Sequence, residues 1–267
     1  MNVFKRCKPL LGTYVELSIA ETASDRALMA LSNRAFDAMA QIDRTMSFHK
    51  LDSELSRINR YAYQCPIDIS SEMYQVLSLA IRLSHLTNGV YDITVAPKLV
   101  EQGLLPDHGW ECDPMADWTA IELGEESILL HRRVVLDLGG IAKGFAVDKA
   151  LEVLKDTNAV VNAGGDLKMS QWQNEKVFIR SPDKPTCAFK TVMMQAAAVA
   201  TSGPYFLGTD KQAIMNPKQE YRTKQACNVS IFSASCMMAD ALTKVASLLP
   251  DAETALLPKL NATVLYH

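Results

Sequence analysis

Three glycines and a lysine stand where an apolar stretch of the chain gives way to a helical pattern. The segment is Asp137-Leu-Gly-Gly-Ile-Ala-Lys-Gly144, and the apolar run Val134-Val-Leu136 before it predicts a buried strand. Backbone N–H groups at the start of a helix favour an anion, and glycine allows a ligand to approach closely. The pattern indicates a nucleotide or metal–phosphate site, although a tight turn that needs glycine only for packing explains the segment equally well.

The segment differs from two common phosphate-binding motifs. Lys143 precedes the last glycine, and no Gly-Lys-Ser or Gly-Lys-Thr follows, so this is not a Walker loop. The spacing Gly-Gly-x-x-x-Gly also differs from the dinucleotide fingerprint. The pattern therefore names no nucleotide by itself.

Two further segments combine glycine with residues that suit a ligand. In Gly89-Val-Tyr-Asp-Ile-Thr-Val-Ala-Pro97, Tyr91 could stack on a flat ring and Asp92 could accept hydrogen bonds from it. The alternative is a helix stop followed by an extended segment, with Tyr91 in the core. In Asn162-Ala-Gly-Gly-Asp166, two glycines at the end of a predicted strand allow close backbone approach. A turn alone would also explain this second segment.

A third segment is a helix that carries an acid, a hydroxyl and a lysine on one face. Asp240, Thr243 and Lys244 are spaced at i, i+3 and i+4. Aspartate and threonine oxygens suit Mg²⁺, but a helix-surface ion pair between Asp240 and Lys244 explains the spacing too. Earlier in the chain, polar residues including His49 precede Ser53, which we expect to cap a short helix.

The elements that must position these residues follow from periodicity and caps. We expect helices over Ser24–Met46, Ser53–Asn59, from Ser70 or Ser71 to Asn88-Gly89, Phe145–Leu154 and Cys236–Leu249. We expect strands at Leu10–Ala20, Ile128–Leu136, Ala159–Asn162, Val177–Arg180, Thr191–Ala200, Asn228–Ala234 and Ala262–Tyr266, and a loop over Pro106–Trp118. The irregular interleaving predicts an α+β fold, with a mixed sheet flanked by helices.

Bulk composition narrows the functional classes. The 267 residues carry a net charge of −3 and no basic stripe, which argues against a nucleic-acid partner. No apolar run reaches the length of a membrane helix, and we expect no membrane anchor. The six cysteines form no C-x-x-C pair, which favours reduced thiols. With no signal-like apolar segment at the N-terminus, we expect a cytoplasmic protein.

Taken in order, these segments resemble the FAD:protein FMN transferases, the ApbE-like flavin transferases. The resemblance begins at Leu11 and covers nearly the whole chain, and we expect a single domain over 1–267, compact and with two intimate lobes. The segments that carry it are Leu11-Gly-Thr13, Met46-Ser47 with Asp52-Ser-Glu-Leu-Ser-Arg57, Gly89–Pro97, Asp137–Gly144, Asn162–Asp166, Ala200-Thr-Ser-Gly203 and Ala239-Asp-Ala-Leu242.

The resemblance implies a reaction and a set of ligands. Members of the family bind FAD, use Mg²⁺, cleave the pyrophosphate, and join FMN to a threonine or serine of a target protein while AMP leaves. The metal would be held by the Gly140 carbonyl and Asp240, with Thr243 as a third candidate ligand. The residues that the resemblance places against the flavin are Leu11, His49, Val90, Tyr91, Asp92, Asp137 and Lys143.

The chain departs from the family pattern at residues expected to do chemistry. Where the family has His-x-x-Asp-Pro-x-Thr-Gly, this chain has Ala213-Ile-Met-Asn-Pro-Lys-Gln-Glu220, so the histidine is replaced by Ala213. The threonine that usually follows the helix aspartate by four residues is Lys244. Three interpretations stay open: an active flavin transferase with a rearranged site, a flavin-binding or target-binding protein that has lost catalysis, and another nucleotide-dependent enzyme.

Overall fold

The computed structural model describes residues 3–180, 188–203, 228–249 and 255–267. The chain divides into two compact units. Among the described residues, the first unit comprises 3–43, 143–180, 188–203, 228–249 and 255–267, and the second comprises 44–142. The sequence-based prediction of one domain over 1–267 stays a prediction.

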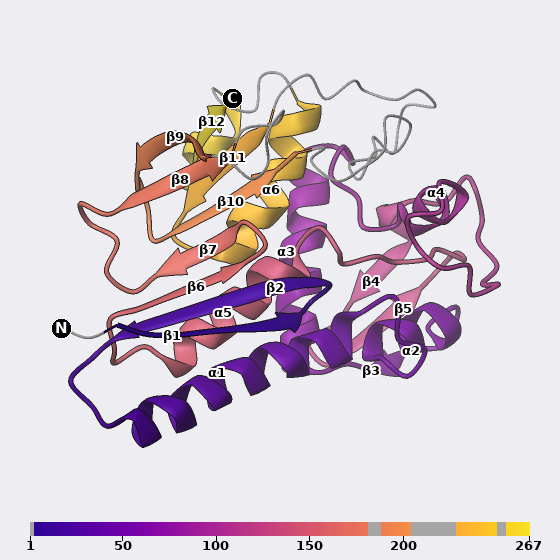
Figure 1. The fold of residues 1–267 in the computed structure, drawn as a ribbon. Helices are drawn as coiled ribbons and strands as arrows, with labels where there is room; N and C mark the ends of the chain where they lie inside the picture. The colour runs from indigo at the N-terminus through magenta and orange to yellow at the C-terminus, as the bar shows by residue number, and fades with distance from the viewer. Residues whose placement is uncertain (1–2, 181–187, 204–227, 250–254) are drawn as a thin grey trace. The chain divides into compact units, whose positions relative to one another are not determined.

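A seven-stranded sheet organises the first unit (Figure 1). Its spatial order is β1-β2-β6-β7-β10-β11-β12, and every neighbouring pair is antiparallel. The α+β class is therefore confirmed, but this sheet is antiparallel where the sequence predicted a mixed one. The strands are β1 (Val3–Leu10), β2 (Thr13–Ala20), β6 (Ala159–Ala163), β7 (Asp166–Met169), β10 (Ala198–Ser202), β11 (Val229–Ser233) and β12 (Thr263–Tyr266).

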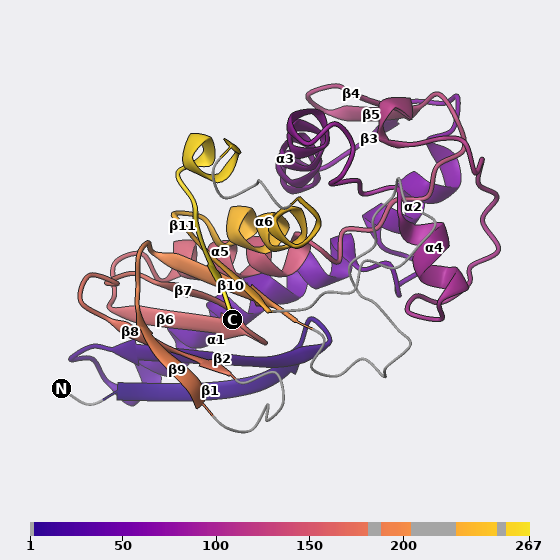
Figure 2. The same cartoon turned by 90° about the horizontal axis from the view of Figure 1, so that it is seen from above.

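Different elements pack on the two faces of this sheet. Helices α5 (Ala142–Val153) and α6 (Cys236–Leu248) lie on one face, as Figure 2 shows, and α1 (Asp25–Met46) reaches β1 on the same face through Arg6. The short 3-10 helix η2 (Leu257–Leu260) precedes β12. The hairpin of β8 (Lys176–Arg180) and β9 (Ala188–Met193) covers the other face. Its core residues are Met169, Val177, Met194, Val199 and Phe232.

The second unit is built from short helices and a three-stranded sheet of order β3-β5-β4. Ser53 and Ser70 cap α2 and α3 with their hydroxyls, as their positions predicted. Glu54 then accepts from both the backbone N–H and the hydroxyl of Ser70, which ties the starts of the two helices together. The elements are α2 (Glu54–Tyr61), β3 (Ile67–Asp68), α3 (Ser71–Leu86), α4 (Ala96–Glu101), η1 (Trp118–Ala120), β4 (Ile121–Leu123) and β5 (Ser127–Leu130).

Some of the element predictions need correction. The expected strand Thr191–Ala200 is two strands, β9 and β10, and strands β1 and β7 were not predicted. The segment after Gly89 is not extended, because it turns into the short helix α4. The loop expected over Pro106–Trp118 is confirmed apart from η1 at its end. Among the described helices, none has the length and apolarity to cross a membrane.

The run Val134–Leu136 is buried as predicted but is not a strand. Asn59 on α2 replaces a strand partner: its amide oxygen accepts from the Leu136 N–H at 2.8 Å, and its amide nitrogen donates to the Leu136 carbonyl at 2.9 Å. One side chain thus satisfies both backbone groups of a fully buried residue, which a sheet ladder would otherwise do. Burial and strand pairing, which usually occur together in apolar runs, are separate here.

Candidate functional site

Two lysines and two aspartates from three elements of the first unit form a buried charge cluster. Lys143 Nζ, in the first turn of α5, lies 3.2 Å from Asp166 Oδ2 and 3.6 Å from Asp240 Oδ2. Lys244 Nζ pairs with Asp240 Oδ1 from one turn further along α6. We call these four residues the lysine–aspartate cluster. Its formal charge is zero, so each buried carboxylate has the partner that its burial requires.

Glycines bring the three elements of the cluster close together. A β-carbon at Gly144 would collide with the carbonyl of Cys236, so only glycine lets α5 pass α6 at this point. The Gly144 N–H also donates to Asp240 Oδ2 at 3.2 Å. Gly164 and Gly165, with φ of 64° and 109°, form the turn that delivers Asp166 to the start of β7. Glycine is therefore required for two reasons: for close approach of the backbones at Gly144, and for the left-handed turn at Gly164 and Gly165.

Burial and mutual charge set the protonation of the cluster. Burial, with the nearby Asp240, raises the pKa of Asp166 to about 6, against the opposing effect of the lysines. Burial also acts to raise the pKa of Asp240, but Lys143 and Lys244 outweigh it and hold that pKa below its ordinary value. Burial acts to lower the pKa of Lys143, and the two carboxylates outweigh it, so this pKa is raised. Both ends of the Lys143–Asp240 pair therefore stay charged near neutral pH.

The contacts of Asp240 do not fit a magnesium ion at this position. Its carboxylate faces both ammonium groups and the Gly144 N–H, and its side chain is only 1% exposed. The Thr243 hydroxyl, the other predicted side-chain ligand, donates to the Asp240 carbonyl at 2.7 Å. Unit charges 4 Å apart interact by about 4 kcal/mol at an effective dielectric of about 20, and a divalent ion doubles this repulsion. Among the described residues, no group of three carboxylate, imidazole or thiol side chains suits a metal.

Asp148 on α5 is a site-forming residue that the sequence analysis missed. It accepts from Ser235 Oγ at 2.7 Å, from the N–H groups of Cys236 and Met237 at 2.9 Å, and from Lys168 Nζ at 2.7 Å. A carboxylate at the N-terminus of α6 satisfies free N–H groups and complements the helix dipole. The sequence did contain a signal for Asp148: it lies among apolar residues of the predicted helix, and a buried charge must have partners.

The neighbouring thiol does not take part in acid–base chemistry. Cys236 opens α6 and is fully buried. Burial first, and then the carboxylates of Asp166, Asp148 and Asp240, raise its pKa well above the ordinary value of a thiol. The thiol therefore stays protonated and is not a nucleophile at neutral pH.

Two more of the predicted segments meet near Asp166. Leu11 and Gly12 form the two-residue turn between β1 and β2, both at positive φ, and Thr13 sits against Gly164, where a side chain would strike the threonine hydroxyl. On the other side, the Thr201 N–H donates to the Gly165 carbonyl at 3.2 Å. Residues from five of the sequence motifs, the first near Leu11 and the last near Asp240, therefore come together in this unit, around the glycine turn and the lysine–aspartate cluster.

In the second unit, a backbone hydrogen bond joins two of the segments that carry predicted flavin contacts. The Asp137 N–H donates to the Ile93 carbonyl at 2.8 Å, which joins the glycine segment to the segment of Tyr91. Tyr91 is 5% exposed. Asp92 Oδ1 accepts from the N–H and hydroxyl of Thr94, both at 2.8 Å, and Oδ2 accepts from the Trp118 N–H at 3.4 Å. Burial raises the pKa of Asp92 against these hydrogen bonds.

The remaining predicted residues of this unit lie closer to solvent. His49 is exposed in the turn before α2, and Val90 and Gly140 are half-buried. Their roles, like those of the other predicted flavin contacts, stay predictions. The positions that depart from the family pattern in the histidine motif, including Ala213, lie outside the described residues.

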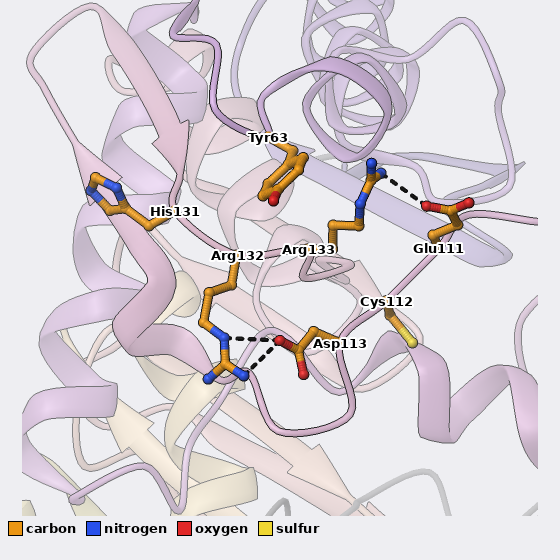
Figure 3. Close-up of a pocket in the computed structure, with 7 residues that line it drawn as sticks. All are labelled: Tyr63, Glu111, Cys112, Asp113, His131, Arg132 and Arg133. Carbon is orange, nitrogen blue, oxygen red and sulfur yellow. Dashed lines mark hydrogen bonds and ion pairs between the residues drawn. The ribbon is translucent and has the colours of Figure 1, made fainter.

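The second unit also has a surface hollow of about 380 Å³, shown in Figure 3. Arg132 pairs with Asp113 at 2.6 Å and Arg133 with Glu111 at 3.2 Å, so its arginines already have carboxylate partners. It contains none of the predicted site residues, and we assign it no function. The lining residues are Tyr63, Glu111, Cys112, Asp113, His131, Arg132 and Arg133.

Solved structures show which fold this is. The ApbE protein of Thermotoga maritima matches 99% of this chain and 94% of its own, with a TM-score of 0.84 and 21% identity. The flavin transferase ApbE of Vibrio cholerae matches 99% of this chain and 93% of its own, with a TM-score of 0.82 and 23% identity. The fold is therefore that of the ApbE proteins.

The sequence comparisons identify the family. The profile of the ApbE family matches residues 11–265, and the chain belongs to this family. The FAD:protein FMN transferase of Haemophilus influenzae is 28% identical over 264 residues, which cover 87% of this chain and 76% of that relative. The enzyme of the same name from Vibrio cholerae is 27% identical over 259 residues, 88% of this chain and 78% of that relative. The resemblance inferred from the motifs is confirmed.

Proposed function

We propose that this protein is an FAD:protein FMN transferase, which moves FMN from FAD to a threonine or serine of a target protein and releases AMP. Membership of the ApbE family over residues 11–265 carries this proposal. The names of its relatives support FAD as the substrate and a protein as the acceptor. We also propose a cytoplasmic location, on the sequence arguments given above.

The reaction exchanges one phosphorus–oxygen bond for another. The acceptor hydroxyl oxygen bonds to the phosphorus on the FMN side, the bond from that phosphorus to the bridging oxygen breaks, and AMP leaves with that oxygen. The hydroxyl proton passes to a base, and the overall exchange consumes no water. Negative charge develops on the departing phosphate, where fixed positive groups stabilise the transition state.

Lys143 could supply the positive charge that this reaction needs beside the phosphate groups. Lys143 combines a charge-paired ammonium with a side chain that is 33% exposed, at the first turn of a helix. Such a position favours the phosphate groups of a dinucleotide. As flavin contacts we propose Leu11, His49, Val90, Tyr91, Asp92, Asp137 and Lys143. Magnesium at Gly140, Asp240 and Thr243 stays a prediction of the resemblance, and no step is assigned to it because the contacts of Asp240 do not fit it.

A second candidate function is flavin binding without transfer. The replacement of the family histidine by Ala213 favours it, because an alanine can neither take nor give a proton. The two functions share FAD binding and differ in AMP release.

Incubation with FAD and a candidate target, encoded beside this chain's gene, tests the proposal. We expect covalent flavin fluorescence on the target and an equal amount of AMP by chromatography. Lys143→Ala should abolish both, whereas Lys149→Ala, which removes a pair with the exposed Glu152 on the same helix, should change neither. Saturable FAD binding without AMP release would select the second function, and no FAD binding would contradict both.

A further inference from the structure

Lys244 is held at Asp240 more firmly than a surface ion pair. Its ammonium contacts both the Oδ1 atom of Asp240 and, at 3.1 Å, the backbone carbonyl of the same residue. Asp240 is 1% exposed, and the side chain of Lys244 is 19% exposed. The surface pair that the i, i+4 spacing suggested is therefore a largely buried one, in which carboxylate and ammonium are both removed from most of the solvent.

The lysine–aspartate cluster is open to solvent on its positive side. The side chains of Asp166 and Asp240 are 5% and 1% exposed, whereas those of Lys143 and Lys244 are 33% and 19% exposed. An anion that approaches the cluster from solvent therefore meets the lysine side chains before the carboxylates. A metal ion that reaches it meets the same two positive charges before it meets a carboxylate.

We propose that the ammonium of Lys244 takes the place of a divalent cation beside Asp240, so that this chain binds the diphosphate of FAD with Lys143 and Lys244 and without a metal ion. The inference rests on the proposed function for the identity of its ligand. Under this proposal Asp240 is not a metal ligand. Its carboxylate instead holds the ammonium groups of two lysines in place. Lys244 keeps its partner, since the Oδ1 atom and the carbonyl of Asp240 take two of its three ammonium protons, and the third can donate to a phosphate oxygen, while Lys143 adds its positive charge.

This arrangement has a consequence for metal binding. Mg²⁺ requires a nearly octahedral set of oxygen ligands at short distance. To reach Asp240 it must first displace Lys244, because an ammonium donates hydrogen bonds and cannot act as a ligand. Removing Lys244 leaves Asp240 paired with Lys143 and the Gly144 N–H, so a variant at this position keeps a compensated carboxylate.

FAD titrations followed by flavin fluorescence, with EDTA or with millimolar Mg²⁺, test the inference. The wild-type protein should show the same affinity in both buffers. Lys244→Thr should lose about tenfold or more in EDTA, the size expected for a hydrogen bond to a charged group, and should recover in Mg²⁺. Lys244→Met, which keeps the aliphatic stem and offers no metal ligand, should show the loss without the recovery. Lys149→Thr is the matched control and should behave as wild type.

Calorimetric titration with Mg²⁺ alone provides a readout that does not depend on FAD. Wild type should show no saturable binding, and Lys244→Thr should show it. The inference is overturned if wild-type affinity for FAD rises tenfold or more with Mg²⁺, or if Lys244→Thr binds FAD in EDTA as wild type does. Failure of wild type to bind FAD in either buffer would contradict the proposed function as well, whereas magnesium-dependent FAD binding would contradict only this inference.

Discussion

Leu11 has a backbone conformation that is unusual for a residue with a branched side chain. Its φ is 57°, and Gly12 beside it has a φ of 70°, so the pair forms the tight turn that joins β1 to β2. Asparagine and glycine are the usual residues at such positions. A leucine retained there is a reason to look for a contact that uses its side chain, and the family resemblance supplies one in the flavin.

Replacing Leu11 should therefore raise the stability of the fold and weaken the binding of FAD. We expect Leu11→Asn to raise the free energy of unfolding by about 1 kcal/mol, because asparagine tolerates the left-handed conformation better. The same variant should bind FAD more weakly. Urea denaturation and FAD titration measure the two effects. Leu51→Asn, at an exposed leucine without positive φ, should change neither; a loss of stability in Leu11→Asn would show that the leucine is held by packing alone.

Asp92 should make stability depend on pH in a direction opposite to that of most paired carboxylates. Burial raises its pKa in the folded protein, so between the unfolded and folded pKa values the native state holds more protons than the unfolded state. The free energy of unfolding should then fall as pH rises through that window, which begins near pH 3.8. Asp92→Asn lacks this contribution. Urea midpoints of both proteins across the acid range should diverge with rising pH and then run parallel; parallel curves throughout would contradict the prediction.

At the scale of elements, α5 and α6 are joined by one carboxylate and one glycine. Asp148 on α5 caps α6, and Gly144 on α5 lets α6 approach. The seven-stranded sheet accommodates both helices with small residues on that face, such as Ala198 and Ala200 of β10, which are fully buried. The positions of Lys143 and Asp240 thus depend on contacts that neighbouring residues of the same two helices make.

Removing the cap should cost more than removing an ordinary ion pair. We expect Asp148→Ala to lower the free energy of unfolding by roughly 3–5 kcal/mol, because it leaves Lys168 and two N–H groups of α6 without their acceptor. Glu152→Ala, on the same helix but in an exposed pair, should cost less than about 1 kcal/mol. Chemical denaturation of the three proteins gives the values. Equal small losses in both variants would show that the cap is not a principal support of α6.

At the scale of the whole molecule, the two units share continuous helices. Helix α1 runs from the first unit into the second at Asp43–Arg44, and α5 crosses between them at Ala142–Lys143. A helix propagates its order along its length, so unfolding one unit should fray an element of the other. This continuity supports the prediction of a single domain.

Scanning calorimetry tests that prediction. We expect one transition whose calorimetric and van't Hoff enthalpies agree, as a two-state domain requires. FAD should move this single transition to higher temperature, because a ligand that binds only the folded state stabilises it by mass action. Two separate transitions, or a shift by FAD of only one of them, would show instead that the chain folds as two domains.

The sequence by itself determined the described α-helices other than α4, the caps of two of them, and the family. Period and capping are local properties, so Ser53 and Ser70 could be assigned as helix caps from their neighbours along the chain. The order of the motifs along the chain identified the ApbE family, because that order can be read from the sequence without knowing the fold. Local patterns did not separate β9 from β10, and they predicted a strand at Val134–Leu136, since an apolar run indicates burial without naming a partner.

Only the tertiary structure decided which charges meet. Asp240 and Lys244 are near each other in sequence, but whether that pair is a surface pair, part of a metal site or an anchor for two lysines depends on Lys143 and Asp166, which arrive from other elements. Likewise, the amide of Asn59 satisfies Leu136 across 77 residues. Such contacts arise from packing between distant segments, and burial then makes each of them obligatory by removing the water that would otherwise satisfy the same groups.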